Sequence, residues 1–203
     1  MRVLRYGERA LMVEVGDHHH ALSLYENLRR EPIDGVVDLV PAARTLLITF
    51  VDERSAKSAT SIVAARTVAP RQQSVGPLVT IPVVYDGADL DAIAELTNLS
   101  VEQVISAHQG CRYVVAFLGF APGFAYLTGL DAALRVPRRS APRTYVPSGS
   151  VAIAGEFGAV YPRASPGGWQ LVGHTNLPMW DLGRQPPATL QPGTRVRFTR
   201  ALP

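Results

Sequence analysis

The sequence predicts an α+β protein in two parts: a two-layer sandwich of strands and helices, then an antiparallel sheet that closes into a barrel or folds as a sandwich. Strand and helix patterns alternate up to residue 68. The apolar periodicity then disappears between Pro70 and Pro77. From Arg112 onward, short apolar runs alternate with proline- and glycine-rich turns, a pattern typical of antiparallel sheets.

The first part contains four expected strands and two expected helices. Asp17 is a suitable cap for the first helix, whose apolar side chains recur on one face and which ends before Pro32. The second helix covers residues 55–68, with Ala59, Ile62, Val63 and Arg66 at helical spacing. The expected strands are residues 2–6, 9–15, 36–40 and 45–51. The order strand, strand, helix, strand, strand, helix predicts helices on one face of a sheet.

The polar stretch at residues 70–77 is the candidate linker, so the expected domains are residues 1–76 and 77–203. Residues 78–85 form the next expected strand, and Pro82 favours an edge position because proline cannot donate a ladder hydrogen bond. Residues 89–98 and 100–109 are expected to be consecutive short helices, with Ser100 capping the second.

Composition limits the classes of function. Apolar residues make up 47% of the chain and charged residues 18%, which predicts packed cores. No apolar run reaches the length of about 18 residues that a membrane span needs, and the N-terminus lacks the apolar core of a signal peptide, so we expect a cytoplasmic protein. The net charge of +3 comes from scattered arginines, which does not predict nucleic-acid binding. The single cysteine, Cys111, excludes an internal disulfide, and a structural role is favoured.

Histidines occur in two patterns of interest. His18, His19 and His20 point about 100° apart on a helix, so they cannot converge on one metal ion, and we expect a solvated helix start and no metal site. His108 lies on the apolar stripe of its helix. Two interpretations remain for it: a buried, hydrogen-bonded histidine, or a catalytic group that transfers protons near the site.

The segment at residues 119–127, GFAPGFAYL, is the densest unusual motif. Pro122 fixes φ and Gly123 permits a positive φ, so the backbone bends sharply between the rings of Phe120 and Tyr126. This geometry predicts a rigid wall for a planar ligand, with free backbone N–H groups beside it. The alternative is a hairpin turn anchored by core aromatics.

Three arginines surround the turn at Pro142, and a serine- and glycine-containing turn follows. Guanidinium groups bind carboxylate or phosphate through two parallel hydrogen bonds, so we interpret this region as an anion site or, alternatively, as surface charge. Arg143 is also a candidate for a catalytic role. The candidate anion-binding residues are Arg138, Arg139, Arg143, Ser148, Gly149 and Ser150.

Residues 165–175, SPGGWQLVGHT, join a glycine turn to a tryptophan and a polar strand end. Neither glycine pattern of a phosphate-binding loop is present, so we expect ligand contact without a nucleotide loop. The candidates here are Gly167, Gly168 and Trp169 for substrate binding and His174 for proton transfer, although a hydrogen-bonded strand histidine is the default interpretation.

These motifs together resemble one family, that of the 5-oxoprolinase B subunit, also named allophanate hydrolase subunit 1 or carboxyltransferase domain, subdomains C and D. The segments that carry the resemblance are residues 119–127, 137–143, 146–155 and 165–175. The resemblance implies an N-terminal two-layer α/β sandwich followed by a cyclophilin-like β-barrel. Where the family commonly has an arginine after the glycine of the tryptophan motif, this chain has His174.

The resemblance also implies a function and partners. It implies the smaller subunit of an ATP-dependent amide or lactam hydrolase, in a hetero-oligomer with the larger 5-oxoprolinase C subunit (allophanate hydrolase subunit 2) and with the 5-oxoprolinase A subunit as a third component. ATP is bound by the complex. The alternative function is inhibition of a sensor histidine kinase, countered by the same kind of large partner. A biotin-linked urea carboxyltransferase is a third possibility.

Overall fold

The computed structural model describes residues 1–66 and 76–202. The chain divides into two compact units, Met1–Ser74 and Val75–Pro203. Most of the expected linker, residues 70–77, lies outside the described residues, so the domain boundary between residues 76 and 77 stays a prediction. The structure confirms the α+β class, with a helix-covered antiparallel sheet followed by a nearly closed barrel.

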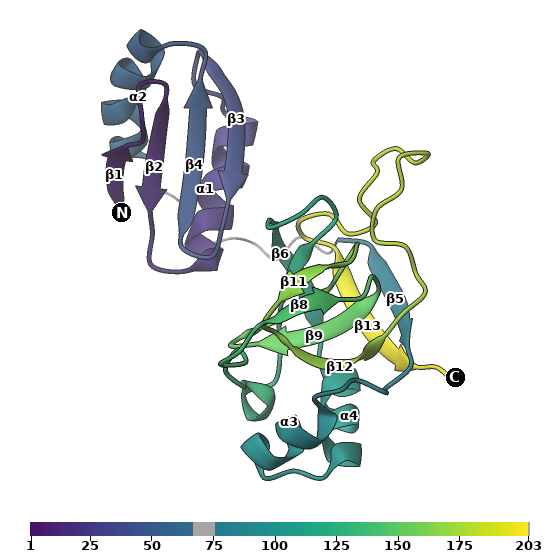
Figure 1. Cartoon of the computed structure of the whole chain (residues 1–203). Helices are drawn as coiled ribbons and strands as arrows, with labels where there is room; N and C mark the ends of the chain where they lie inside the picture. The colour runs from purple at the N-terminus through teal and green to yellow at the C-terminus, as the bar shows by residue number, and fades with distance from the viewer. Residues whose placement is uncertain (67–75, 203) are drawn as a thin grey trace. The chain divides into compact units, whose positions relative to one another are not determined.

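The first unit is a four-stranded antiparallel sheet packed against two helices (Figure 1). Its strand order is β1-β2-β4-β3. Alternate side chains on the central strands, such as Leu11 and Ile48, are fully buried against the helices because successive strand residues point to opposite faces. The strands are β1 (Arg2–Arg5), β2 (Ala10–Glu14), β3 (Val36–Pro41) and β4 (Thr45–Phe50).

Each helix of this unit begins at an aspartate cap. Asp17 accepts a hydrogen bond from the His20 N–H at the start of α1 (His18–Arg30), as expected. Asp52 accepts one from the Ser55 N–H, so α2 (Glu53–Ala65) begins two residues before the predicted start. Ile62, predicted on the apolar face of α2, is exposed.

The second unit is a seven-stranded sheet that curls into a nearly closed barrel (Figure 1). Its strand order is β12-β9-β10-β7-β6-β13-β5. A bridge between Val84 and His174 joins its two end strands. The strands are β5 (Leu78–Val83), β6 (Tyr113–Leu118), β7 (Ala125–Thr128), β9 (Ser150–Ala154), β10 (Phe157–Val160), β12 (Gln170–His174) and β13 (Arg195–Arg200).

Strand β5 differs from the antiparallel expectation. It lies at one end of the strand order, as Pro82 predicted, but it pairs with β13 in parallel. A parallel pair joins segments far apart in the chain, and local patterns do not specify it. A separate two-stranded sheet of β8 (Arg143–Val146) and β11 (Ser165–Gly167) accompanies the barrel.

Two helices, which follow β5 and precede β6 in the chain, pack against the barrel. Leu90–Thr97 forms α3 and Val101–Gly110 forms α4, with a capping box between Ser100 and Gln103. A short 3₁₀ helix, η1, spans Ala132–Leu134. No helix among the described residues is long and apolar enough to cross a membrane.

Candidate functional site

The two motifs that stand out in the sequence meet through an aromatic cluster, defined as Phe124, Tyr126, Tyr161 and Trp169. The ring of Trp169 lies 5.6 Å from that of Phe124 and 5.6 Å from that of Tyr126, both in edge-to-face geometry. Edge-to-face pairs are the favourable arrangement of aromatic quadrupoles. Trp169 is buried, so the ring predicted to line a pocket is mainly a core residue.

The backbone around Pro122 turns twice in six residues. The Ala121 N–H donates to the Gly119 carbonyl at 2.7 Å, and Phe120 between them has φ +67°, the geometry of a rare, strained γ-turn. The Phe124 N–H then donates to the Ala121 carbonyl, closing a turn in which Gly123 has φ +81°. This strained turn holds the Phe120 ring 62% exposed to solvent.

Gly123 is required by packing as well as by its φ. A Cβ there would lie 2.9 Å from both the Met179 carbonyl oxygen and the Trp180 Cβ. A similar close approach occurs at Gly167, where a Cβ would overlap the Tyr161 hydroxyl. Both glycines were predicted to lie in ligand-binding segments, but in this structure other parts of the chain itself pack closely against them.

Arg138 is exposed and lies over the aromatic cluster. Its guanidinium carbon is 5.9 Å from the centre of the Trp169 ring, within cation–π range. Burial raises the pKa of the Tyr161 phenol, although a hydrogen bond from the Trp169 backbone and the charge of Arg138 oppose this. Among residues 1–66 and 76–202, no carboxylate pairs with Arg138.

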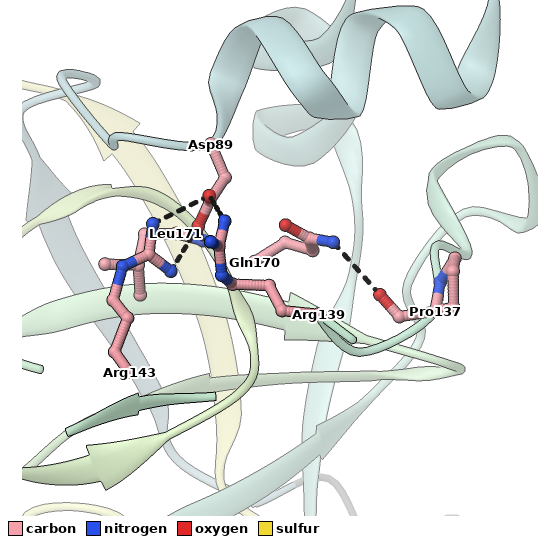
Figure 2. A network of polar contacts seen from close by, with 6 residues as sticks. All are labelled: Asp89, Pro137, Arg139, Arg143, Gln170 and Leu171. Carbon is pink, nitrogen blue, oxygen red and sulfur yellow. Dashed lines mark hydrogen bonds and ion pairs between the residues drawn. The ribbon is translucent and has the colours of Figure 1, made fainter. Parts of the chain in front are cut away.

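Arg139 and Arg143 have a carboxylate partner within the chain (Figure 2). Arg143 donates to both oxygens of Asp89, from Nη1 to Oδ2 at 2.9 Å and from Nη2 to Oδ1 at 2.8 Å, and Arg139 Nη1 donates to Oδ1 at 2.6 Å. The backbone N–H of Leu171 donates to Oδ2 at 2.7 Å. We call these four residues the Asp89 clamp.

The clamp keeps the carboxylate of Asp89 ionised although the residue is only 1% exposed. Burial alone raises the pKa of this carboxyl. Hydrogen bonds from Arg143 and Leu171, together with the charges of both arginines, outweigh burial and hold the pKa below its usual 3.8. The guanidinium groups therefore do bind an anion, but the anion in this structure is the side chain at the start of α3.

Two hydrogen bonds to backbone carbonyls hold the same region. Gln170 donates from Nε2 to the Pro137 carbonyl at 3.2 Å (Figure 2), and the Arg139 N–H donates to the Gly168 carbonyl at 2.8 Å. Residues 137–143 are thus fastened along residues 168–171. These hydrogen bonds explain why the arginine segment and the tryptophan motif lie side by side although they are far apart in the chain.

The predicted serine turn lies beside His174. The Thr175 N–H donates to the Gly149 carbonyl at 2.9 Å, and Ser150 is the cross-strand partner of His174. Ser150 is buried, and the exposed Ser148 donates to the Pro162 carbonyl. His174 Nδ1 lies 2.9 Å from Asp86 Oδ1, and both side chains are partly exposed.

His108 lies in the barrel core and is fully buried. Its Nδ1 is 2.9 Å from the Tyr85 hydroxyl, and its ring packs 4.7 Å from that of Phe198. Burial lowers its pKa to about 3, so the imidazole is neutral at neutral pH. This placement favours the buried, hydrogen-bonded interpretation over proton transfer.

Two acidic residues of this region, Asp86 and Asp89, were not predicted as site residues. Asp89 was predicted only to begin a helix, and Asp86 only to follow a strand. Their partners are 50 or more positions away, so no local spacing marks them. Cys111 makes structural contacts at the end of α4, and no described group of histidine, cysteine or acidic residues is arranged to hold a metal.

Comparison with known proteins identifies the family. The model of the carboxyltransferase domain, subdomain C and D, matches residues 1–190. The chain is 52% identical over 123 residues to the 5-oxoprolinase B subunit of Escherichia coli O157:H7, a match that covers 59% of this chain and 56% of that relative. It is 33% identical to the 5-oxoprolinase B subunit of Bacillus subtilis (strain 168) over 98% of this chain and 92% of the relative.

A solved structure agrees. The crystal structure of TTHA0988 superimposes with a TM-score of 0.80 at 38% identity and covers 96% of this chain, which spans 40% of that longer chain. The resemblance drawn from the sequence motifs is confirmed. The chain belongs to the family of the carboxyltransferase domain, subdomain C and D.

Proposed function

We propose that this chain is the smaller subunit of an ATP-dependent amide or lactam hydrolase complex, of the 5-oxoprolinase or allophanate hydrolase type. The observation that carries the proposal is the likeness to two 5-oxoprolinase B subunits, one at 52% identity and one aligned over 98% of the chain. The match covers just over half the length of the first relative. Both relatives are named as subunits, so the activity is proposed for a complex and not for this chain alone.

The reaction needs activation, because amide resonance makes lactam hydrolysis slow. Phosphorylation of the carbonyl oxygen by ATP would provide a leaving group, and cationic donors would stabilise the charge that develops. Arg138 supports this role, because it is exposed and stacks over Trp169 without a described carboxylate partner. Arg139 and Arg143 fit less well, because Asp89 already occupies their guanidinium groups.

The partners follow from the same proposal. We expect a hetero-oligomer in the cytoplasm with the larger 5-oxoprolinase C subunit, or allophanate hydrolase subunit 2, and with the A subunit where 5-oxoproline is the substrate. The sequence lacks a phosphate-binding loop. ATP binding is therefore assigned to the complex and to no residue of this chain.

The test is reconstitution. The chain is co-expressed and purified with the larger C subunit and the A subunit of the same organism, and ATP hydrolysis dependent on 5-oxoproline is measured together with glutamate. Formation of glutamate supports the proposal, and a stable complex that forms none contradicts it. If the isolated chain instead blocks autophosphorylation of a sensor kinase without turnover, the regulatory alternative is favoured.

A substitution pair then tests Arg138. Arg138→Gln removes the charge over Trp169, and we expect kcat/KM to fall about 100-fold, as on loss of one charge-stabilising donor. Arg135→Gln is the matched control, because Arg135 is exposed in the same segment and makes no described ion pair. Equal activity of the two variants would place the anion contact elsewhere.

A further inference from the structure

The seam of the barrel brings together a histidine and an aspartate from distant segments. Where the end strands meet, the Val84 N–H donates to the His174 carbonyl and the His174 N–H donates to the Val84 carbonyl, both at 2.9 Å. The Gly87 N–H continues the contact by donating to the Val172 carbonyl. The backbone on either side of Asp86 is therefore fixed against the strand that carries His174.

This arrangement orients the imidazole. Asp86 Oδ1 lies 2.9 Å from His174 Nδ1, so in the neutral ring Nδ1 carries the proton that the carboxylate accepts. The basic nitrogen is then Nε2, on the opposite side of the ring, in a side chain that is 43% exposed. A carboxylate on Nδ1 that leaves Nε2 without an internal partner is the arrangement by which enzymes orient a histidine that takes and returns a proton.

A second histidine–aspartate pair in the chain shows what a purely structural contact looks like. His20 Nδ1 lies 2.8 Å from Asp17 Oδ1, but the same oxygen caps α1 by accepting the His20 backbone N–H. That pair forms within three residues of sequence. The pair of His174 and Asp86 spans 88 positions, caps no helix and exists only when the barrel has folded.

The neighbours of His174 define the chemistry it can perform. Ser150 is its partner on the adjacent strand, and cross-strand partners lie on the same side of a sheet. Ser150 is buried, and the hydrogen bonds of the described residues do not join it to His174. The pair therefore has no serine nucleophile of its own, and the proton it can take comes from water.

We propose that Asp86 and His174 form a proton-transfer dyad for the opening of the amide bond, an inference that rests on the proposed function. In the step, the oxygen of a water molecule bonds to the carbonyl carbon and its proton passes to His174 Nε2. The carbon–nitrogen bond then breaks, and Nε2 returns that proton to the departing nitrogen. The carbonyl carbon is left as an acyl phosphate, which a second water molecule hydrolyses to the carboxylate and inorganic phosphate. Asp86 is a positioning residue, which holds the ring and the transient positive charge.

The orientation is tested in the isolated chain by NMR of the ring nitrogens. The five histidines are assigned by substitution, and the tautomer of His174 is measured at a pH where the ring is neutral. We expect the proton on Nδ1 in the wild type and a shift toward the Nε2-protonated form in Asp86→Asn. A His174 ring with its proton on Nε2 in the wild type would overturn the dyad, whatever the complex does.

The role is tested in the reconstituted complex. We expect His174→Gln to lower kcat about 100-fold with KM changed less than about 2-fold, in the range of a lost general base. We expect Asp86→Asn to lower kcat at least about 10-fold and Asp86→Glu to recover part of it. His20→Gln is the matched control, and its kcat should equal that of the wild type. Tryptophan fluorescence melts check the fold of the isolated His174 and Asp86 variants, and circular dichroism melts check that of His20→Gln, because both tryptophans belong to the barrel unit.

The outcomes separate the two proposals. Turnover by the wild-type complex that is unchanged in His174→Gln overturns the dyad and leaves the proposed function standing. Loss of turnover in His174→Gln with full activity in Asp86→Asn overturns the positioning role of Asp86. A complete complex that forms no glutamate overturns the proposed function, and the dyad's part in amide opening fails with it.

Discussion

Removal of the Asp89 carboxylate tests the central structural claim about the barrel. Asp89→Asn keeps the shape of the side chain but removes the charge that two guanidinium groups and the Leu171 N–H share. Breaking a buried ion pair by removing one partner costs about 3–5 kcal/mol. The arginine side chains are 35% and 22% exposed, so water screens part of the loss. We expect the free energy of unfolding to fall by about 3 kcal/mol.

The assay exploits the distribution of tryptophans. Both tryptophans of the chain, Trp169 and Trp180, belong to the barrel unit, so their fluorescence reports its unfolding and not that of the first unit. A loss of about 3 kcal/mol corresponds to a fall in Tm on the order of 10 °C. Asp91→Asn, an exposed carboxylate in the first turn of the same helix, should change Tm by less than about 2 °C.

A small effect of Asp89→Asn would refute this reasoning. If the variant unfolds within about 0.5 kcal/mol of the wild type, the clamp does not stabilise the barrel. The two arginines would then be free to serve an external anion. A fall as large in Asp91→Asn would instead show that the helix start responds to any loss of negative charge.

Three further predictions concern backbone strain and a buried histidine. Because Phe120 has φ +67°, Phe120→Gly should be more stable than Phe120→Ala by about 1 kcal/mol in urea unfolding, and the opposite order would contradict the strain. Gly123→Ala should lose about 2 kcal/mol or more, against about 1 for Gly155→Ala, where a Cβ meets nothing within 4 Å; equal losses would exclude the packing argument. His108 has a folded pKa of about 3, below its unfolded value of 6.5, so the unfolded state binds more protons between these two values. Stability therefore decreases as the pH falls below about 6.5, by roughly 2–3 kcal/mol at pH 4.5. A His108→Leu variant should lose this slope, and a slope that persists in it would assign the effect to other groups.

Local structure was predictable where the physics is local. The helix caps at Asp17 and Ser100 lie within three residues of the N–H groups they accept from, so the sequence contains the whole interaction. The period-two burial of β2 and β4 follows from alternation in the same way. The predicted start of α2 at residue 55 was wrong, because the residue that caps the helix, Asp52, lies outside the apolar pattern from which the helix was predicted.

Pairings across the chain were not predictable from spacing. The parallel register of β5 and β13 joins residues 78 and 195, and no motif in either strand specifies it. The arginine cluster shows the limit most clearly. Its residue types predicted an anion-binding site, but the sequence could not show that the carboxylate of Asp89 lies 2.6–2.9 Å from the guanidinium groups in the folded chain.

The ion pairs of Arg139 and Arg143 with Asp89 change which residues of the barrel are the best candidates for contact with a substrate. An arginine that holds Asp89 bidentately presents little free hydrogen-bonding capacity to a substrate, and releasing it would leave a buried carboxylate unpaired. Arg138 is exposed, and the side chains of Asp86 and His174 are partly exposed. Contact of these residues with a substrate would therefore leave no buried charge unpaired and would not disturb the Asp89 clamp. Catalytic groups of an amide-opening enzyme must be free to exchange protons and charge with substrate. On that criterion the seam at His174 and the cation over Trp169, and not the arginine pair, are the chemically available parts of the barrel.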